Sequence, residues 1–330
     1  MGAGRLKPPG MTTDLPTPDA PLRIGTRGSP LALAQAHETR ARLCAAFDLP
    51  HEAFEIKVIR TTGDDRAMIA ADRPLKEIGN KGLFTREIEE QLSDGRIDIA
   101  VHSMKDMPTM QPHGLIIDCI LAREDVRDAL IRPGGGTLFD LPQGAVVGTS
   151  SLRRRAQLLH KRPDLRVVEF RGNVQTRLKK LEDGVAAATF LACAGLRRLA
   201  MTDVPMHPIA PEDMLPAVAQ GAIGIERRMD DSRMSWMLAA IHDGPTGLRL
   251  AAERSFLAKL DGSCETPIAA LAQIEGETLR LRGEILKPDG SEAHAGEVSG
   301  ALDEGEALGV SLANSLMARA GAGFFDWREC

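Results

Sequence analysis

The sequence predicts a multidomain α/β protein that ends in a smaller α+β domain. Strand-like and helix-like segments alternate twice, at about 21–122 and 127–215, a pattern typical of parallel sheets joined by crossover helices. Past residue 244 the pattern changes to a helix, hairpin-like strands and a final helix. The length of 330 residues exceeds the needs of one small core and fits two or three domains.

The first repeat begins with a short strand at 22–26, and a helix follows whose apolar residues recur at helical spacing. Ser29 can cap this helix, and Pro30 stands where its missing N–H costs nothing. We expect further strands at 54–60, 97–103 and 115–121, and an amphipathic helix over 84–95 that Gly95 closes.

The second repeat shows three segments that resemble strands running into loops, AVVGTSS, RVVEFRG and AAATFLACAG. The helices between them are expected in LRRRAQLLHKR and NVQTRLKKLEDG. In the C-terminal part, TGLRLAAERSFLAKLDG and GEALGVSLANSLMARAG predict helices on either side of a hairpin over 268–290.

The composition excludes several classes of protein. The first 20 residues hold four prolines and no apolar stretch, so we expect a disordered leader rather than a signal peptide, and a cytoplasmic protein. The sequence contains no apolar run of about 18 residues, so it predicts no membrane-spanning helix. The five cysteines are widely spaced without a CxxC pair, which disfavours disulfides and zinc. A net charge of −5 and 3% aromatic residues argue against nucleic-acid binding.

Polar residues gather where the predicted strands end. In an open α/β sheet ligands bind at the carboxyl ends of the strands, and helix N-termini there favour anions. Arginine suits a carboxylate because its planar guanidinium can donate two hydrogen bonds. The sequence therefore predicts a carboxylate or phosphate site formed by residues at successive strand ends: Arg27, Ser29, His102, Ser103, Lys105, Asp106, Thr149, Ser150, Ser151, Arg153, Arg154, Arg171 and Asn173.

Two residues could carry chemistry. Asp106 follows a hydrophobic strand, where it could stabilise a positive charge or transfer a proton, or else serve as a turn or capping residue. Cys264 stands in the loop LDGSCETP, where its thiolate could attach a carbon electrophile, unless it is an ordinary loop thiol. His102 is expected to be structural, and the spacing of the histidines predicts no metal site.

Taken together, the motifs resemble the porphobilinogen deaminase (hydroxymethylbilane synthase) family. The matching segments follow the family's order and cover nearly everything from about residue 21 onward: RIGTRGSPLALAQA, GNKGLFTREIE, DIAVHSMKDMP, VGTSSLRRRAQL, FRGNVQTRLKKL, AGLRRL, LPAVAQGAIGIE and LDGSCETPIA. The resemblance implies two lobes of the periplasmic-binding-protein type with mainly parallel sheets, and a small α+β domain. Residues 21–121 and 220–240 would form the first lobe, 127–215 the second and 244–330 the third domain, after a leader at 1–20.

The resemblance also implies an activity. A transferase of this family condenses four porphobilinogen molecules head to tail on a dipyrromethane cofactor, releases ammonia, and frees hydroxymethylbilane by hydrolysis for tetrapyrrole and haem biosynthesis. One dipyrromethane would be bound to Cys264 by a thioether. Each ring bears two carboxylates, so a set of arginines is required. The family further suggests a monomer.

Roles carried over by position assign catalysis to Asp106 with Lys105. Cofactor binding would fall to Cys264, Asp106, Lys105, Ser151, Arg153, Arg154 and Arg177. Substrate binding would fall to Arg27, Ser29, Arg171, Arg177, Arg198, Lys81, Phe84 and Gln220. Two positions depart from the family's pattern: Ala219, where glycine is usual and which would stiffen a hinge, and Glu77, where a lysine is often found.

Two other classes of function remain open from the residues. A two-lobed anion-binding protein without catalysis would bind a small carboxylate reversibly and would not need Cys264. An RNA-binding protein could use the run Arg153–Arg155, but the acidic net charge and the scarcity of stacking residues weaken that interpretation.

Overall fold

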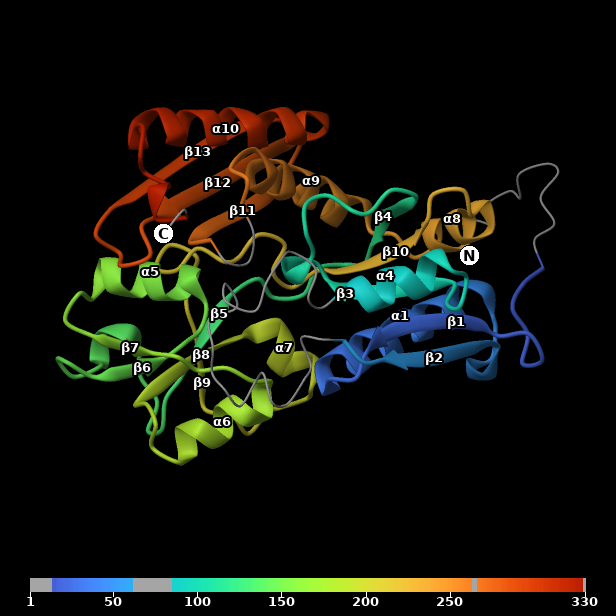
Figure 1. Ribbon diagram of the computed structural model, residues 1–330, viewed down its shortest axis with the longest axis horizontal. Coiled ribbons are helices and arrows are strands. Elements are labelled where there is room, and N and C mark those ends of the chain that lie inside the picture. The colour runs from blue at the N-terminus through green and yellow to red at the C-terminus, as the bar shows by residue number, and fades with distance from the viewer. Residues whose placement is uncertain (1–13, 62–84, 263–265, 329–330) are drawn as a thin grey trace.

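The computed structural model describes residues 14–61, 85–262 and 266–328. Their strands form three sheets, two of five strands and one of three (Figure 1). The two larger sheets lie in separate lobes, and the small sheet stands beside the second lobe with two helices on its far side (Figure 1). The predicted class, two α/β lobes and a small α+β domain, is confirmed.

The first sheet has the order β2-β1-β3-β10-β4. Its strands are β1 (Leu22–Arg27), β2 (Phe54–Ile59), β3 (Ile99–Ser103), β4 (Leu115–Ile120) and β10 (Ile223–Arg228). The helices α1 (Pro30–Phe47), α4 (Arg86–Ser93) and α8 (Ser232–Ala239) belong to this part of the chain. Ser29 caps α1 as predicted, since its hydroxyl accepts from the N–H of Ala32, and Pro30 is the first helical residue.

The second sheet repeats this plan in the order β7-β6-β8-β5-β9. Its strands are β5 (Asp128–Ile131), β6 (Val146–Gly148), β7 (Arg166–Val168), β8 (Ala188–Ala192) and β9 (Met206–Pro208), and its helices are α5 (Leu152–Lys161), α6 (Val174–Glu182) and α7 (Cys193–Arg198). A side chain at Gly148 would stand 2.3 Å from the Phe170 ring, so only glycine lets this buried ring pack on β6.

The two larger sheets are mainly parallel, as expected, and each contains one reversed strand. The first three strands of each sheet pair in parallel, but β10 runs antiparallel to β3 and β4, and β5 runs antiparallel to β8 and β9. The antiparallel strands are the ones next to the two crossings between sheets, at 121–127 and 209–222. A strand that arrives from the other lobe has no crossover helix to fix its direction as parallel.

The small sheet consists of β11 (Ile268–Glu275), β12 (Thr278–Leu286) and β13 (Ala293–Ala301), all antiparallel. Its apolar face packs on α9 (Gly244–Lys259) and α10 (Gly305–Ala320) in a core that includes Phe256, Leu281 and Leu312. The opposite face turns toward α5 of the second lobe (Figure 1). Short 3₁₀ turns complete the described chain: η1 (His51–Ala53), η3 (Met104–Asp106), η4 (Leu138–Asp140), η5 (Leu302–Glu304) and η6 (Asp326–Arg328).

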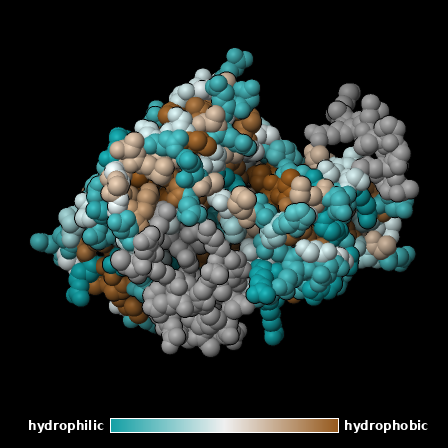
Figure 2. Space-filling model, turned by 45° about the horizontal axis from the view of Figure 1, so that its top comes forward, coloured by the Kyte–Doolittle hydropathy of each residue, from teal (hydrophilic) through white to brown (hydrophobic). Residues whose placement is uncertain are grey.

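The surface in Figure 2 alternates between hydrophilic residues and small hydrophobic groups. No helix among the described residues is both long enough and apolar enough to cross a membrane.

One buried ion pair ties the crossings to the small domain. Arg123, in the first crossing, donates from both terminal nitrogens to Glu253 of α9 at 2.6 and 3.0 Å, and from Nε to the carbonyl of Gln220 in the second crossing. Glu253 is 0% exposed and also accepts from the N–H groups of Ala219 and Ala272. A single carboxylate therefore joins both crossings, α9 and β11.

Glu253→Ala should lower the free energy of unfolding by about 3–5 kcal/mol, because it leaves the buried Arg123 without its counter-charge and two N–H groups without an acceptor. Urea denaturation measures the loss. Glu90→Ala, which removes an exposed partner of Arg86, is the control and should cost no more than about 0.5 kcal/mol. Equal losses in the two variants would contradict this account of Glu253.

Candidate active site

A pocket of about 80 Å³ opens at the carboxyl ends of β1 and β3, which are adjacent and parallel. Because the loops after such strands leave the sheet at the same edge, residues far apart in sequence meet there. Its lining includes Arg27 and Ser29 after β1, and His102, Ser103 and Asp106 in and after β3. The first-lobe part of the predicted site is thus brought together.

Lys105 and Asp106 lie in the 3₁₀ turn η3, which the buried Met104 anchors to the core. Asp106 is exposed and lines the pocket. Burial lowers the pKa of Lys105; Asp106 opposes this change, while the charges of Arg154 and Arg177 add to it. Lys105 of the first lobe is therefore close to arginines of the second lobe.

The second lobe supplies Arg177 from α6 and Arg171 from the loop before it. Burial first, and then the charges of Arg154 and Arg171, lower the pKa of Arg177 to about 10 against the opposing charge of Asp106. Its Nε donates to the carbonyl of Gly172 at 2.9 Å. The charge of Asp106 in the first lobe thus acts on a cation of the second lobe.

Arg153 and Arg154 are almost fully buried in the first turn of α5, which Ser151 caps. Both bind the carboxylate of Asp128 at 2.8 Å, a residue that is 0% exposed at the start of β5. Arg153 also donates to Gln157 and to the carbonyl of Leu215, and Arg154 to the carbonyl of Phe190. Most of their donors are therefore used inside the protein.

Gln220 and Arg198 lie at the crossings. Gln220 is 1% exposed and donates to the carbonyl of Val126 and the carboxylate of Asp128, so it links the two crossings. Arg198 donates to Glu38 of α1 at 3.1 Å and to the carbonyl of Gly221, so it joins α7 to the first lobe. Both side chains make structural contacts beside the predicted binding cluster.

Ala219 adopts the left-handed region with φ of 59° in the second crossing. This conformation explains why glycine is usual here, and alanine holds it at a cost in backbone energy. The remaining residues named from the sequence lie outside the described residues: Cys264, Lys81, Phe84 and Glu77.

Sequence reasoning missed two buried acids, Asp128 and Glu226. Glu226 of β10 lies 3.0 Å from Nε2 of His102, which makes His102 the structural residue that the sequence predicted. The only signal for either acid was a carboxylate beside an apolar run, in RDALI and GAIGIE. Within the described ranges no group of histidine, cysteine or acidic residues is arranged to hold a metal ion.

The family profile described as "Porphobilinogen deaminase, dipyromethane cofactor binding domain" matches residues 22–236, and the profile of the family's C-terminal domain matches residues 248–318. The chain belongs to the porphobilinogen deaminase family. A porphobilinogen deaminase from Paracoccus denitrificans (strain Pd 1222) is 65% identical over 315 residues, 96% of this chain and 99% of that protein.

Solved structures of periplasmic binding proteins are remotely similar. An arginine-specific protein from Salmonella typhimurium has a TM-score of 0.37 and 15% identity, covering 67% of this chain and 91% of its own. An arginine transport protein from Legionella pneumophila has a TM-score of 0.37 and 14% identity, covering 67% and 90%.

The cross-lobe cluster fits the dipyrromethane of the porphobilinogen deaminase family, whose rings carry carboxylates. The charge of Arg154 lowers the pKa of both Lys105 and Arg177, and the negative charge of Asp106 opposes both changes. The carboxylate of Asp128 balances the charges of Arg153 and Arg154. Cations that depress one another's pKa in a buried setting gain free energy when a further anion binds.

Asp128→Asn should lower the free energy of unfolding by about 3–5 kcal/mol at neutral pH, because two buried guanidinium groups lose their counter-charge. Burial alone would raise the pKa of Asp128, but Arg153 and Arg154 lower it well below its usual value. Its stabilising contribution is therefore complete above the unfolded pKa of about 3.9 and declines as the pH falls through and below that value.

The difference between the native protein and Asp128→Asn should consequently be largest near neutral pH and shrink at about pH 3, as measured by urea denaturation. Asp230→Asn, on an exposed turn, is the control and should change the neutral-pH value by less than about 0.5 kcal/mol. A difference that stays constant with pH would refute the assignment.

Proposed function

We propose that the chain acts as a hydroxymethylbilane synthase, a transferase that condenses four porphobilinogen molecules head to tail with release of ammonia and of hydroxymethylbilane. The observation that carries this proposal is the pocket at the ends of β1 and β3, where the exposed carboxylate of Asp106 lies with Arg27 and Ser29. The charges of Arg154 and Arg177 from the other lobe also act on Lys105 beside it. Such a cluster offers one exposed carboxylate among several cations. It suits a substrate that carries an amine and two carboxylates.

Asp106 is the proposed catalytic carboxylate. Its carboxylate lines the pocket beside Arg27 and Ser29, where it can accept hydrogen bonds from pyrrole N–H groups. A fixed carboxylate stabilises positive charge that develops on the substrate as ammonia leaves, and it can hold the proton that the reacting ring loses. Lys105, with its lowered pKa, orients the substrate's carboxylate and assists proton transfer.

The cations are proposed to hold carboxylates of substrate and cofactor. Arg27, Ser29, Arg171, Arg177 and Arg198 would contact the substrate, with Lys81, Phe84 and Gln220. Arg153 and Arg154, held by Asp128, would act mainly through their charge, because the protein already uses most of their donors. Arg198 would need to exchange its bond to Glu38 for a substrate carboxylate.

Dipyrromethane is proposed to be attached to Cys264 by a thioether and held by Lys105, Asp106, Ser151, Arg153, Arg154 and Arg177. When bound, it supplies a pyrrole carbon that acts as the nucleophile toward the substrate. We further propose domain limits of 21–121 with 220–240, 127–215 and 244–330, a leader at 1–20, a cytoplasmic location and a monomer. The crossings at 121–127 and 209–222 support these limits.

Asp106→Asn should lower kcat by at least about 10²-fold while the protein keeps its fold and its cofactor, because the amide cannot stabilise developing positive charge. Turnover of porphobilinogen measures kcat, and intact mass reports the cofactor. Asp94→Asn, on the exposed end of α4, is the matched control and should leave kcat unchanged. Native kcat in Asp106→Asn would remove Asp106 from the catalytic role.

Intact mass and a peptide map of the freshly purified protein should show one dipyrromethane on the peptide that contains Cys264. Cys264→Ala should lack this mass and lose turnover, because no other group offers the thioether sulfur at that place. Cys44→Ala, in the buried face of α1, is the control and should keep both. If native Cys264 is unmodified and porphobilinogen does not restore the modification, a non-catalytic anion-binding protein becomes the better description.

A further inference from the structure

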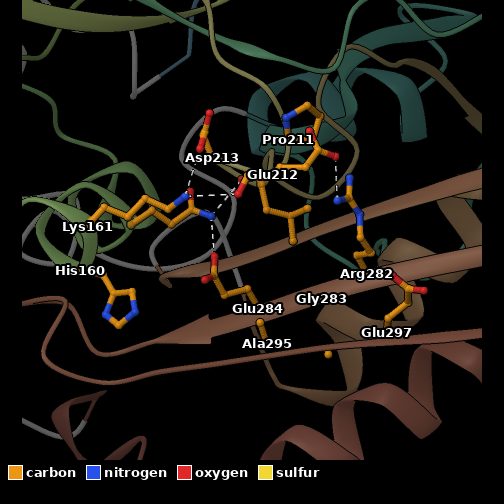
Figure 3. Close-up of a pocket in the computed structure, with 13 residues that line it drawn as sticks. His160, Lys161, Pro211, Glu212, Asp213, Arg282, Gly283, Glu284, Ala295 and Glu297 are labelled. Carbon is orange, nitrogen blue, oxygen red and sulfur yellow. Dashed lines mark hydrogen bonds and ion pairs between the residues drawn. The ribbon is translucent and has the colours of Figure 1, made fainter. Parts of the chain in front are cut away.

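A second, larger cavity of about 370 Å³ lies between the second lobe and the small domain (Figure 3). It shares no lining residue with the pocket around Asp106. Its walls are the last turns of α5, the segment 211–215 and the face of β12 and β13 that points away from α9 and α10. This volume lies in the range of natural small-molecule pockets, about 300–1,000 Å³.

The strand β12 places charge on this face by simple alternation. Leu281 and Ile285 point into the helix-covered core, so Arg282 and Glu284 point toward the cavity. A side chain at Gly283 would meet Phe256 and Leu312 on the helix side, and the floor between Arg282 and Glu284 is therefore backbone. The backbone positions of these two residues are about 7 Å apart along the strand.

Glu284 is the carboxylate of the cavity that forms no ion pair among the described residues, although its charge acts on the buried Arg153. The other acids of the lining are paired: Glu212 with Arg282, Asp213 with Lys161, and Glu297 with Arg280. Glu284 accepts only a hydrogen bond from the amide of Gln157, at 2.6 Å (Figure 3). A carboxylate that lines a cavity without an ion pair can take a cation from solution as its partner.

The cations of the cavity keep donors that a ligand can use. Nε of Arg282 is buried and makes no hydrogen bond with any described group, although its terminal nitrogen donates to Glu212 at 3.0 Å. Nζ of Lys161 donates to the carbonyl of Glu212 at 3.2 Å and lies 3.6 Å from the carboxylate of Asp213, which leaves part of its ammonium free. A buried unsatisfied N–H gains free energy when an acceptor enters.

We propose that this cavity binds a small amino acid in its zwitterionic form, with its ammonium on Glu284 and its carboxylate on Arg282 and Lys161. The separation of Arg282 and Glu284 along β12 favours ligands in which several carbons separate the amine from the acid. Pro211, Leu215 and Ala295 supply apolar contact for that carbon chain. The site lies outside the cluster proposed for porphobilinogen condensation and does not depend on that proposal.

The cavity is joined to the buried arginines by hydrogen bonds. Gln157 donates to Glu284 with its nitrogen and accepts from Arg153 with its oxygen, and Arg153 in turn binds Asp128. Only the side chain of Gln157 therefore stands between Glu284 and Arg153. This connection gives the cavity a physical link to the cross-lobe cluster.

Calorimetric titration of the full-length purified protein with three matched probes tests the proposal: 5-aminopentanoate, pentanoate and pentylammonium. The zwitterion should bind at least tenfold more tightly than either singly charged probe. Glu284→Gln should weaken its binding at least tenfold, while the Gln side chain still accepts from Gln157 and keeps the fold, as thermal unfolding will show. Glu275→Gln, an exposed carboxylate of the same small sheet outside the cavity, is the control and should change the affinity less than twofold.

Arg282→Met is the second variant and should reduce the advantage of the zwitterion over pentylammonium at least threefold, because one of the two contacts to the ligand carboxylate is lost while the contact of its ammonium with Glu284 remains. Equal binding of the three probes to the native protein, native affinity in Glu284→Gln, or absence of binding at millimolar 5-aminopentanoate would each overturn the proposal.

Discussion

The buried ion pairs between the carboxylate of Asp128 and two guanidinium groups hold the centre of this protein together. A buried ion costs much free energy unless it is paired and hydrogen-bonded, and Asp128 meets that requirement with Arg153, Arg154 and Gln220. These partners come from α5 and from the second crossing. The pairing therefore fixes the first turn of α5 against both β5 and the second crossing. It also leaves an excess of positive charge, shared with Lys105 and Arg177, that faces the other lobe.

The sequence was sufficient to predict the fold class and the meeting of the strand-end residues of the first lobe in one pocket. Local signals were strong there: Ser29 with Pro30 marks the start of α1, and the apolar run before His102 marks β3. Strand-end loops then place Arg27 and Asp106 at one sheet edge. The strands β5, β9 and β10 escaped pattern reasoning because they are short or reached by long crossings, and only the family resemblance suggested that the first lobe takes back the chain near residue 220.

The buried partners of the arginines could not be predicted from the sequence for a physical reason. Arg153 and Arg154 look like free cations at a helix start, and only tertiary structure shows that Asp128, 25 or 26 positions away, occupies them. The same limit applies to the cavity beside the small domain. Arg282 and Glu284 read as ordinary alternation on an exposed strand face until α5 is seen to cover that face. Helix α5 thus contributes to two sites: its first turn supplies the buried arginines, and its last turns line the cavity.

The junction of Arg123 and Glu253 bears on how inherited changes in this chain would act. Because one carboxylate serves both crossings, α9 and β11, a substitution at either residue loosens several parts of the fold at once without touching Asp106. In a cell, proteases remove molecules that unfold more often, so the amount of enzyme would fall while each surviving molecule worked at its usual rate. Low abundance with normal specific activity would therefore identify a substitution at this junction. A substitution in the pocket around Asp106 would instead leave abundant enzyme with a low rate.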